Sequence, residues 1–504
     1  MPEAIKAAIP ILFLGSLILQ LNKGLSTKLI STNEYKLWRF LWISTTLIAF
    51  FSFNYWLSTY LLIALITAKA ARASTTSTTS KQSTPFLNYL WLLPLLPVLP
   101  KDIPGFMGIN FLFELSYPRL LSILLLYPLF LSNTNKQSAF LRLPGDKLLM
   151  LYLFINVILT SRNGEITNIL RSNFYIFIDI FLPYYAASRA LTTLQDLKKV
   201  AFILFCTASM LALIGIFESL KVWHLYASLN NSLDINQRFS TYLFRDNTLR
   251  ASGPFSSAIV LGYFISIGIN MGLAIKPSFK KTQASTIVFA VLILGLLLTL
   301  SRGPWIGTLV SAAIFMLLTQ PVSKLIKNIA GITILITPII LFSSFGQKIV
   351  SLLPFINDSN TAVGTVTYRQ ELFENAWIVI LRHPLLGSNT YLNTPEMQSM
   401  IQGQGIIDIV NSYLRIALNS GLLGVGVFCL FFLSLLIRLY RSQQKAKKIS
   451  SEAHILGAGL LATMISILLI IATVSSIDIV SELYWLLAGV CVAYLNIIKR
   501  TPTK

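Results

Sequence analysis

Residues 285–319 read STIVFAVLILGLLLTLSRGPWIGTLVSAAIFMLLT, two apolar runs on either side of the polar turn Ser301-Arg302-Gly303-Pro304. Each run approaches the ~20 residues that a helix needs to cross a hydrocarbon core of about 30 Å. The runs are continuously apolar, which favours membrane helices over the alternating strands of a membrane barrel. This stretch therefore predicts a helical hairpin in a membrane.

The same pattern extends along the whole chain. Of its 504 residues, 55% are hydrophobic and 12% are charged, and the mean hydropathy is +0.70. A soluble domain has roughly 25% charged residues. We therefore predict an all-α polytopic membrane protein with about 12 to 15 transmembrane helices and a large, partly helical extracytoplasmic loop. Four prolines within 86–113 predict a broken or re-entrant segment there.

The apolar runs and the loops between them divide the chain into four parts. We expect N-terminal transmembrane helices in 1–170, with a Ser/Thr-rich cytoplasmic linker at 73–84 that has too few apolar residues to form a core. The other three parts are central transmembrane helices, a large external loop, and C-terminal helices with a basic tail, at 171–343, 344–420 and 421–504.

The distribution of basic residues predicts the orientation. The formal charge is +21, and 26 of the 40 Lys and Arg lie in one set of alternate loops or in the C-terminal tail. The positive-inside rule makes that set cytoplasmic. The two longest loops, 218–254 and 344–420, and the turn at 301–304 then face the outside. Since the basic residues act as topology determinants, we expect no nucleic-acid partner.

Three arginines fall on this predicted outer side: Arg250, Arg302 and Arg369. An arginine near hydrocarbon costs about 2.5–3.5 kcal/mol on insertion scales, so it is usually paired or functional. One such arginine would be explained by snorkelling to headgroups or by a helix terminus. Three on one side favour a shared anionic ligand, and guanidinium groups suit the diphosphate of a lipid.

The sequence predicts no metal site and no cofactor, because the three histidines are far apart and no carboxylates have ligand spacing. Candidates for a general base are His383, Asp408 and Glu396. Pro384 restricts His383 to an extended backbone, which also fits a structural role. Further carboxylates, for which a solvated or capping role is the default, are Glu218, Glu371, Glu374, Asp478 and Glu482.

Several short motifs together resemble the O-antigen ligase and polymerase superfamily in order and spacing, over roughly residues 170 to 495. They are Arg250 in Arg-x-x-Gly-Pro-Phe, Ser301 to Gly307, Arg369 with Trp377, Arg382 to Gly387, Asn411 to Leu414, Ser420 to Gly424, and Tyr484 to Gly489.

The resemblance implies a metal-independent glycosyltransferase of the bacterial inner membrane, active on its periplasmic or external face. Its donor would be a glycan on a polyprenyl diphosphate, and its acceptor a lipid, a glycan repeat or a protein hydroxyl. Membrane lipids would surround it. The resemblance assigns the diphosphate to Arg250 and Arg302, and more loosely to Arg369. Asn411 and Tyr413 join them as candidate substrate-binding residues.

One position departs from the family. Where the ligases have a histidine before this Asn-containing stretch, the chain has Val410, which cannot accept a proton. Asp408 or another outer carboxylate would replace it, or departure of the diphosphate would need no base. The departure favours a polysaccharide polymerase, or a ligase-like enzyme with another acceptor, over a lipopolysaccharide ligase. It also leaves open an inactive relative that serves as an assembly partner.

The alternative from another class is a polysaccharide or lipid transporter or flippase. Transport normally places ionisable residues near the bilayer centre. In this chain the predicted spans contain few apart from Asp179, and the polar residues concentrate in two external loops. This distribution favours surface chemistry over transport.

Overall fold

In the computed structural model, the described residues are 3–25, 29–52, 55–74, 83–106, 108–132, 140–232, 244–245, 248–280, 282–321, 323, 360–402 and 405–501. The end of the predicted central helices at 324–343, the start of the predicted external loop at 344–359, most of the linker at 73–84 and the middle of the 218–254 loop lie outside them.

Helices make up nearly all of the regular structure, which confirms the all-α polytopic membrane class. The helices and strands are, in chain order, α1 (Glu3–Leu25), α2 (Thr32–Phe51), α3 (Trp56–Ser74), α4 (Ser83–Leu92), β1 (Lys101–Pro104), β2 (Phe111–Leu115), α5 (Tyr117–Leu121), η1 (Ser122–Leu126), α6 (Tyr127–Ser132), α7 (Asp146–Thr160), η3 (Ser161–Asn163), α8 (Ile166–Tyr175), η4 (Ile176–Phe181), α9 (Leu182–Ala190), α10 (Leu194–Lys221), α11 (Ala227–Ser232), β3 (Phe244–Arg245), β4 (Thr248–Leu249), α12 (Ala258–Ile275), η6 (Lys276–Ser278), α13 (Thr282–Leu298), α14 (Arg302–Thr319), α17 (Asn360–Arg382), η7 (Tyr391–Asn393), α18 (Pro395–Gln398), α19 (Ser412–Ala446), α20 (Ser451–Ile470) and α21 (Val480–Arg500).

Within the described residues, seven helices are long and apolar enough to cross a membrane: α1, α10, α12 with η6, α14, α19, α20 and α21. Three shorter apolar helical stretches lie at 56–70, 117–132 and 283–298. The expected total of about 12 to 15 spans concerns the whole chain and stays a prediction.

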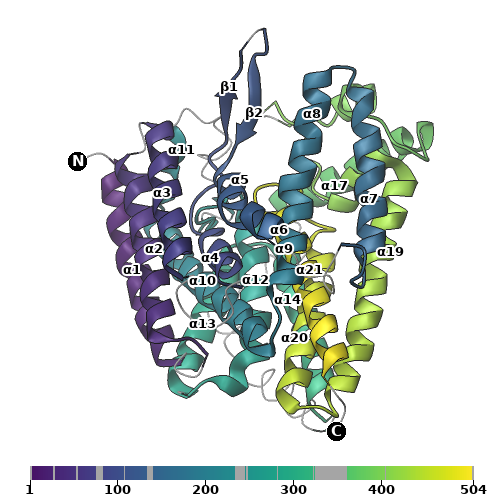
Figure 1. The fold of residues 1–504 in the computed structure, drawn as a ribbon. Helices are drawn as coiled ribbons and strands as arrows, with labels where there is room; N and C mark the ends of the chain where they lie inside the picture. The colour runs from purple at the N-terminus through teal and green to yellow at the C-terminus, as the bar shows by residue number, and fades with distance from the viewer. Residues whose placement is uncertain are drawn as a thin grey trace.

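The proline-rich stretch breaks its helix, as the sequence predicts. Helix α4 ends at Leu92, before Pro94, and its ten residues extend only about 15 Å. Strands β1 and β2 then pair antiparallel, with Lys101 opposite Leu115. Helix α4 is therefore too short to cross a bilayer, and Figure 1 shows the hairpin projecting beyond the helices.

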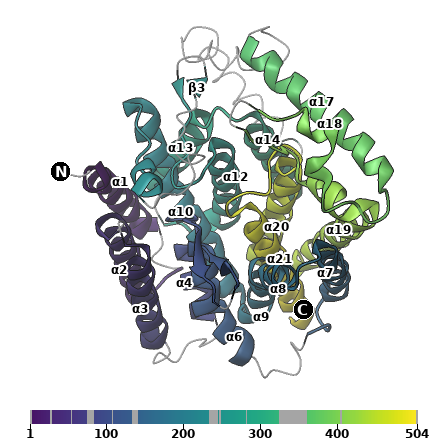
Figure 2. The same ribbon diagram turned by 90° about the horizontal axis from the view of Figure 1, so that it is seen from above.

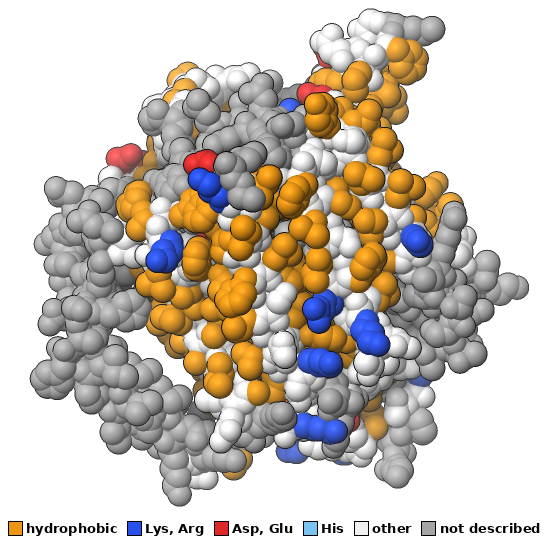
Figure 3. Space-filling view, turned by 90° about the vertical axis from the view of Figure 1, so that its left-hand side faces the viewer, with side chains coloured by type: hydrophobic (Ala, Val, Ile, Leu, Met, Phe, Trp, Pro, Cys, Tyr) orange, Lys and Arg blue, Asp and Glu red, His pale blue; other side chains and the backbone are white. Residues whose placement is uncertain are grey.

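The helices separate into a central group and a peripheral group. Most residues of α10, α12, α20 and α21 are buried, whereas only about a third are buried in α14 and α19. Figure 2 shows α12 and α20 in the middle, with α1, α2 and α3 on one side and α17 and α19 on the other. The outer side of α1, α2 and α3 is apolar (Figure 3), as expected for a lipid-facing surface.

Asp179, the ionisable residue noted within a predicted span, lies in the continuous helical run formed by α8, η4 and α9. Its carboxylate pairs with the Arg119 guanidinium at 2.9 Å, and Arg119 also contacts Glu114 at 3.0 Å. A charge that stays in a membrane is usually paired in this way.

Candidate arginine and polar-cavity site

The three predicted arginines come together at one end of the helical bundle. Burial lowers the pKa of Arg250 to about 10, and the nearby charges of Arg245 and Arg369 contribute to this shift. Burial also lowers the pKa of Arg369, and the charge of Arg302 contributes. Arg250, Arg302 and Arg369 are therefore neighbours, with Arg245 as a fourth member. We call these four residues the arginine cluster.

Four separate segments position the cluster. Arg245 lies in β3, Arg250 follows β4, Arg302 begins α14, and Arg369 lies in α17. The short segment before α14 is the common support, because Arg245 donates to the carbonyl oxygen of Leu300 at 2.8 Å. Arg250 binds the same segment.

Arg250 makes two contacts with it. Its Nε donates to the carbonyl oxygen of Thr299 at 3.2 Å, and its Nη2 donates to Ser301 Oγ at 2.9 Å. The Ser301-Arg302 turn is therefore a docking point for the loop that carries Arg250.

Arg369 reaches the loop between α20 and α21. Its Nη2 donates to the carbonyl oxygen of Thr473 at 3.3 Å, and its buried Nε has no hydrogen-bond partner among the described residues. A buried donor without an acceptor is unfavourable, and so is a group of like charges. An anion at this position would relieve both costs.

Asp408 is the candidate base that lies beside the cluster. Its charge raises the pKa of Arg369, against the larger effect of burial. Its Oδ1 accepts a hydrogen bond from Ser475 Oγ at 2.5 Å, and Tyr368 donates to its carbonyl oxygen at 3.0 Å. These contacts fix Asp408 between α17 and the loop that Arg369 contacts.

Glu218 has a structural role at the same end of the bundle. Its buried carboxylate accepts hydrogen bonds from the backbone nitrogens of Leu225 at 3.0 Å, Ser252 at 3.3 Å and Gly253 at 2.8 Å. It thus joins the end of α10 to the loop that follows Arg250. This accounts for a buried carboxylate without any catalytic role.

Each of the remaining candidate carboxylates accepts hydrogen bonds from another residue, pairs with an arginine, or is exposed or buried on a helix. Asp478 accepts hydrogen bonds from the backbone nitrogen of Ser256 at 2.8 Å and from its hydroxyl at 2.6 Å, and burial raises the pKa of Asp478 to about 6. Glu396 pairs with Arg382 at 3.0 Å. Glu371 and Glu374 are exposed on α17, and Glu482 is buried in α21.

His383 is not placed near the cluster. It is exposed just after α17, fourteen residues beyond Arg369, which is about 21 Å along a helix axis. Its neighbours in sequence bind a kink in α19 instead. The Pro384 carbonyl accepts from the nitrogen of Leu422 at 2.7 Å, and Ser388 donates to the carbonyl of Leu418 at 2.8 Å. The His-Pro-Leu-Leu-Gly motif therefore has a structural explanation.

Asn411 and Tyr413 lie at the start of α19. The Asn411 side-chain oxygen caps this helix by accepting from the backbone nitrogens of Tyr413 at 2.9 Å and Leu414 at 3.1 Å. The Tyr413 hydroxyl donates to the carbonyl of Leu468 at 2.9 Å. Both side chains thus fix the position of the chain directly after Val410.

A polar cavity of about 390 Å³ lies next to these elements. Its lining is rich in amides and hydroxyls and contains two arginines that the sequence did not single out. The lining residues are Tyr152, Asn156, Leu159, Thr160, Arg162, Ser172, Asn389, Arg415, Ile416, Asn419, Ser420, Ser476 and Tyr484.

The loop at 471–479 connects the cavity to the arginine cluster. Thr473 accepts from Arg369, Ser475 donates to Asp408, and Ser476 both lines the cavity and accepts from Arg415 Nη1 at 3.2 Å. Arg415 follows Asn411 by one helical turn, and that spacing is the one signal by which the sequence could have revealed it.

The described residues contain no group of three or more His, Cys, Asp and Glu side chains that could hold a metal ion. The expected independence from metal stays a prediction.

A model of a known family matches the part of the chain that carries most of this site. Residues 287–429 match the family described as O-antigen ligase. The resemblance to the O-antigen ligase and polymerase superfamily is confirmed. The match includes Arg302, Arg369 and the start of α19, whereas Arg245 and Arg250 precede it.

The chain is also similar to an O-antigen polymerase from Salmonella muenchen, with 25% identity over 211 residues. This similarity covers 39% of the chain and 50% of the relative. The chain thus spans about half the length of the curated relative that it matches.

Proposed function

We propose that this protein is a membrane glycan transferase that moves or polymerises oligosaccharide repeats carried on a polyprenyl diphosphate. The arginine cluster is the observation that carries the proposal. Four segments bring positive charge to one partly buried position, and the Asp408 carboxylate is the negative charge that acts on Arg369 there. A diphosphate has the charge and the oxygen geometry to occupy this position.

The cluster would act on the leaving group. When the glycosidic bond to the carrier breaks, negative charge develops on the diphosphate oxygen that departs. Fixed cations in a site with little water stabilise such charge, and this is usually the largest catalytic contribution. Arg250 and Arg369 are both buried enough for this effect.

The polar cavity would bind the acceptor. Amide, hydroxyl and guanidinium groups suit the hydroxyls of a sugar, and the cavity lining contains all three. Asp408, fixed by Ser475 on the connecting loop, would accept the proton of the attacking hydroxyl. Since Val410 cannot do so, a glycan acceptor, and hence polymerisation, is preferred over ligation to lipopolysaccharide.

The orientation of the site rests on the charge distribution. Twenty-six of the 40 basic residues lie in the loops at the other end of the predicted spans or in the C-terminal tail. By the positive-inside rule, the arginine cluster and the cavity would face the periplasm or the exterior from the inner membrane of a bacterium.

Glycan transfer by purified protein in lipid nanodiscs tests the proposal. The donor is a supplied polyprenyl-diphosphate oligosaccharide, and mass spectrometry measures the glycan length. We expect Arg302→Ala to lower the transfer rate about 100-fold or more, as the loss of one oxyanion donor does elsewhere. Arg382→Ala removes an exposed arginine of α17, paired with Glu396, and serves as the matched control with near wild-type activity.

Wild-type product from Arg302→Ala would contradict the assignment of the cluster. Unchanged glycan length with every variant and with the wild type, together with movement of the donor between leaflets, would instead support the flippase alternative.

A further inference from the structure

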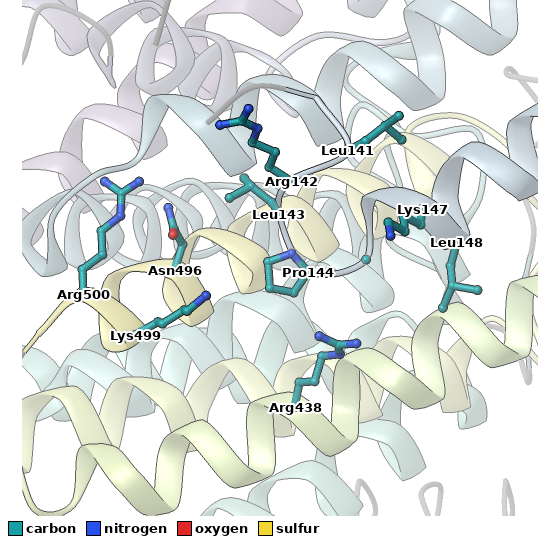
Figure 4. A pocket seen from close by; sticks show the side chains of 11 residues that line it. Leu141, Arg142, Leu143, Pro144, Lys147, Leu148, Arg438, Asn496, Lys499 and Arg500 are labelled. Atoms are coloured by element: carbon teal, nitrogen blue, oxygen red, sulfur yellow. The ribbon is translucent and has the colours of Figure 1, made fainter. Parts of the chain in front are cut away.

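A second basic site lies away from the arginine cluster, where three segments meet. The loop before α7 contributes Arg142, the first turn of α7 contributes Lys147, α19 contributes Arg438, and the end of α21 contributes Lys499 and Arg500. They surround a cavity of about 800 Å³, shown in Figure 4 around Pro144. We call it the basic pocket. None of the described residues that line it is acidic.

The loop that forms one wall is held in place by a buried ion pair. The Asp146 carboxylate accepts from Arg189 Nη2 at 2.6 Å, from the backbone nitrogen of Leu143 at 3.0 Å and from the Tyr184 hydroxyl at 3.0 Å. Asp146, the acidic residue nearest in sequence to the residues that line the pocket, therefore directs its carboxylate to hydrogen bonds inside the protein. It does not neutralise the adjacent Lys147.

The pocket also borders an apolar surface. Leu141 is exposed at its rim, and α19 exposes Leu433 and Ile437 within five residues of Arg438. Cations next to exposed apolar side chains match the boundary between phospholipid headgroups and acyl chains. A soluble anion would need the cations but not the leucines.

We propose that the basic pocket binds an anionic phospholipid whose headgroup carries two phosphates. Even without Arg142, the four cations Lys147, Arg438, Lys499 and Arg500 exceed what one phosphate diester neutralises, and the volume of the pocket accommodates a larger headgroup. The phosphates would contact the cations of α19 and α21, and the acyl chains would lie along the apolar face of α19. This site is independent of the proposed glycan transfer and lies in the loops predicted to be cytoplasmic.

Lipid binding to the full-length protein tests this proposal. Native mass spectrometry in detergent would compare cardiolipin, which has two phosphates, with phosphatidylglycerol, which has one, and with inorganic pyrophosphate. We expect cardiolipin to bind at least tenfold more tightly than either. The double variant Arg438→Gln/Lys499→Gln should lower cardiolipin affinity at least tenfold.

The matched control is Lys445→Gln/Lys447→Gln, which removes two exposed charges near the end of α19 outside the pocket lining. It should change the affinity less than twofold. An equal loss in both double variants would show nonspecific attraction and overturn the proposal. Pyrophosphate binding as tight as that of cardiolipin would also overturn it, in favour of a soluble anion.

The variants concern exposed side chains, so thermal melting should confirm that they fold. If Arg438→Gln/Lys499→Gln melts early, Arg142→Gln/Lys147→Gln tests the opposite wall of the same pocket, with the same tenfold loss expected.

Discussion

Asp408 stands beside the arginine cluster, where its charge acts on Arg369. A carboxylate that acts as a base needs to reach the acceptor. Ser475 Oγ fixes the Asp408 side chain at 2.5 Å, on the loop that also lines the polar cavity through Ser476. The other candidate carboxylates bind backbone groups, pair with Arg382, lie exposed or are buried in α21.

We predict that Asp408→Asn lowers kcat for glycan transfer about 100-fold or more, the usual contribution of a positioned base. Donor binding should be retained, because the substitution removes a negative charge beside the cluster. Steady-state kinetics would measure both effects, with the exposed Glu374→Gln on α17 as the control. A kcat within twofold of wild type would show that the reaction needs no base at this position.

Asp478 predicts a pH dependence of stability. Burial raises its pKa in the folded protein from 3.8 to about 6, so between these values the folded state holds a proton that the unfolded state lacks. The stability of the wild type should therefore fall as pH rises from about 4 to about 6, and this contribution should stay constant above pH 6.

Asn at this position keeps an acceptor for Ser256 and cannot ionise. The apparent Tm of Asp478→Asn minus that of the wild type should become more positive between about pH 4 and pH 6, then level off. Melting curves in detergent would measure it. A difference that does not change with pH would mean that Asp478 keeps its ordinary pKa.

At the residue scale, the sequence predicts Arg250, Arg302 and Arg369 because a guanidinium near an apolar run requires an explanation. It does not single out Arg245, Arg162 or Arg415, since an arginine in a loop or one turn into a helix is ordinary. Nor does it separate Asp408 from the other carboxylates. That distinction depends on contacts across more than 60 positions of the chain, such as Asp408 with Ser475.

At the element scale, α19 is defined by its kink. Gly421 has φ of 65° in the middle of this helix, and a Cβ there would lie 2.3 Å from the Leu385 carbonyl carbon. Gly387, with φ of 66°, meets the same kink from the other side, where a Cβ would lie 2.5 Å from the Leu418 carbonyl oxygen. Arg162 donates to the carbonyls of Gly387 and Asn419 and completes the joint.

The two Leu-Leu-Gly motifs at 385–387 and 422–424 thus belong to one packed joint. The sequence shows both motifs, but only the fold shows that they touch, because a helix with an internal break gives no periodic signal that differs from two helices.

We predict that Gly421→Ala destabilises the protein by about 1–3 kcal/mol, because its φ of 65° with ψ of −170° is a backbone region that almost only glycine adopts, and the steric contact adds to this cost. The matched control is Gly426→Ala on the same helix, where a Cβ would meet nothing within 4 Å. Melting of both variants in detergent would measure the difference. Equal melting temperatures would mean that the kink can relax without cost.

At the scale of the whole molecule, hydropathy and charge suffice to predict a helical membrane protein with its polar residues at one end. The prolines also predict the break after α4, but not the hairpin of β1 and β2 that follows it. Hydropathy and charge also cannot predict the cavity, which forms where α7, η3, α8, α19 and the 471–479 loop meet. Such a meeting point depends on packing between distant segments.

The predicted orientation has its own test. Two variants, both with Cys429→Ala, would each carry one introduced cysteine. Ser399→Cys changes a residue next to α18, and Lys447→Cys changes the residue directly after α19, at the end of that helix opposite to Ser412. We expect an impermeant maleimide to label Ser399→Cys in cells with an open outer membrane, and Lys447→Cys only after lysis. The reverse pattern would place the arginine cluster in the cytoplasm.

The central claim is that the arginine cluster binds the diphosphate of a carrier lipid, and direct binding tests it most simply. Binding of a polyprenyl diphosphate without its glycan would be measured for the wild type, Arg369→Ala and the exposed control Arg382→Ala. We predict at least a tenfold loss of affinity for Arg369→Ala and none for Arg382→Ala. Equal affinity of the wild type and Arg369→Ala would contradict the account.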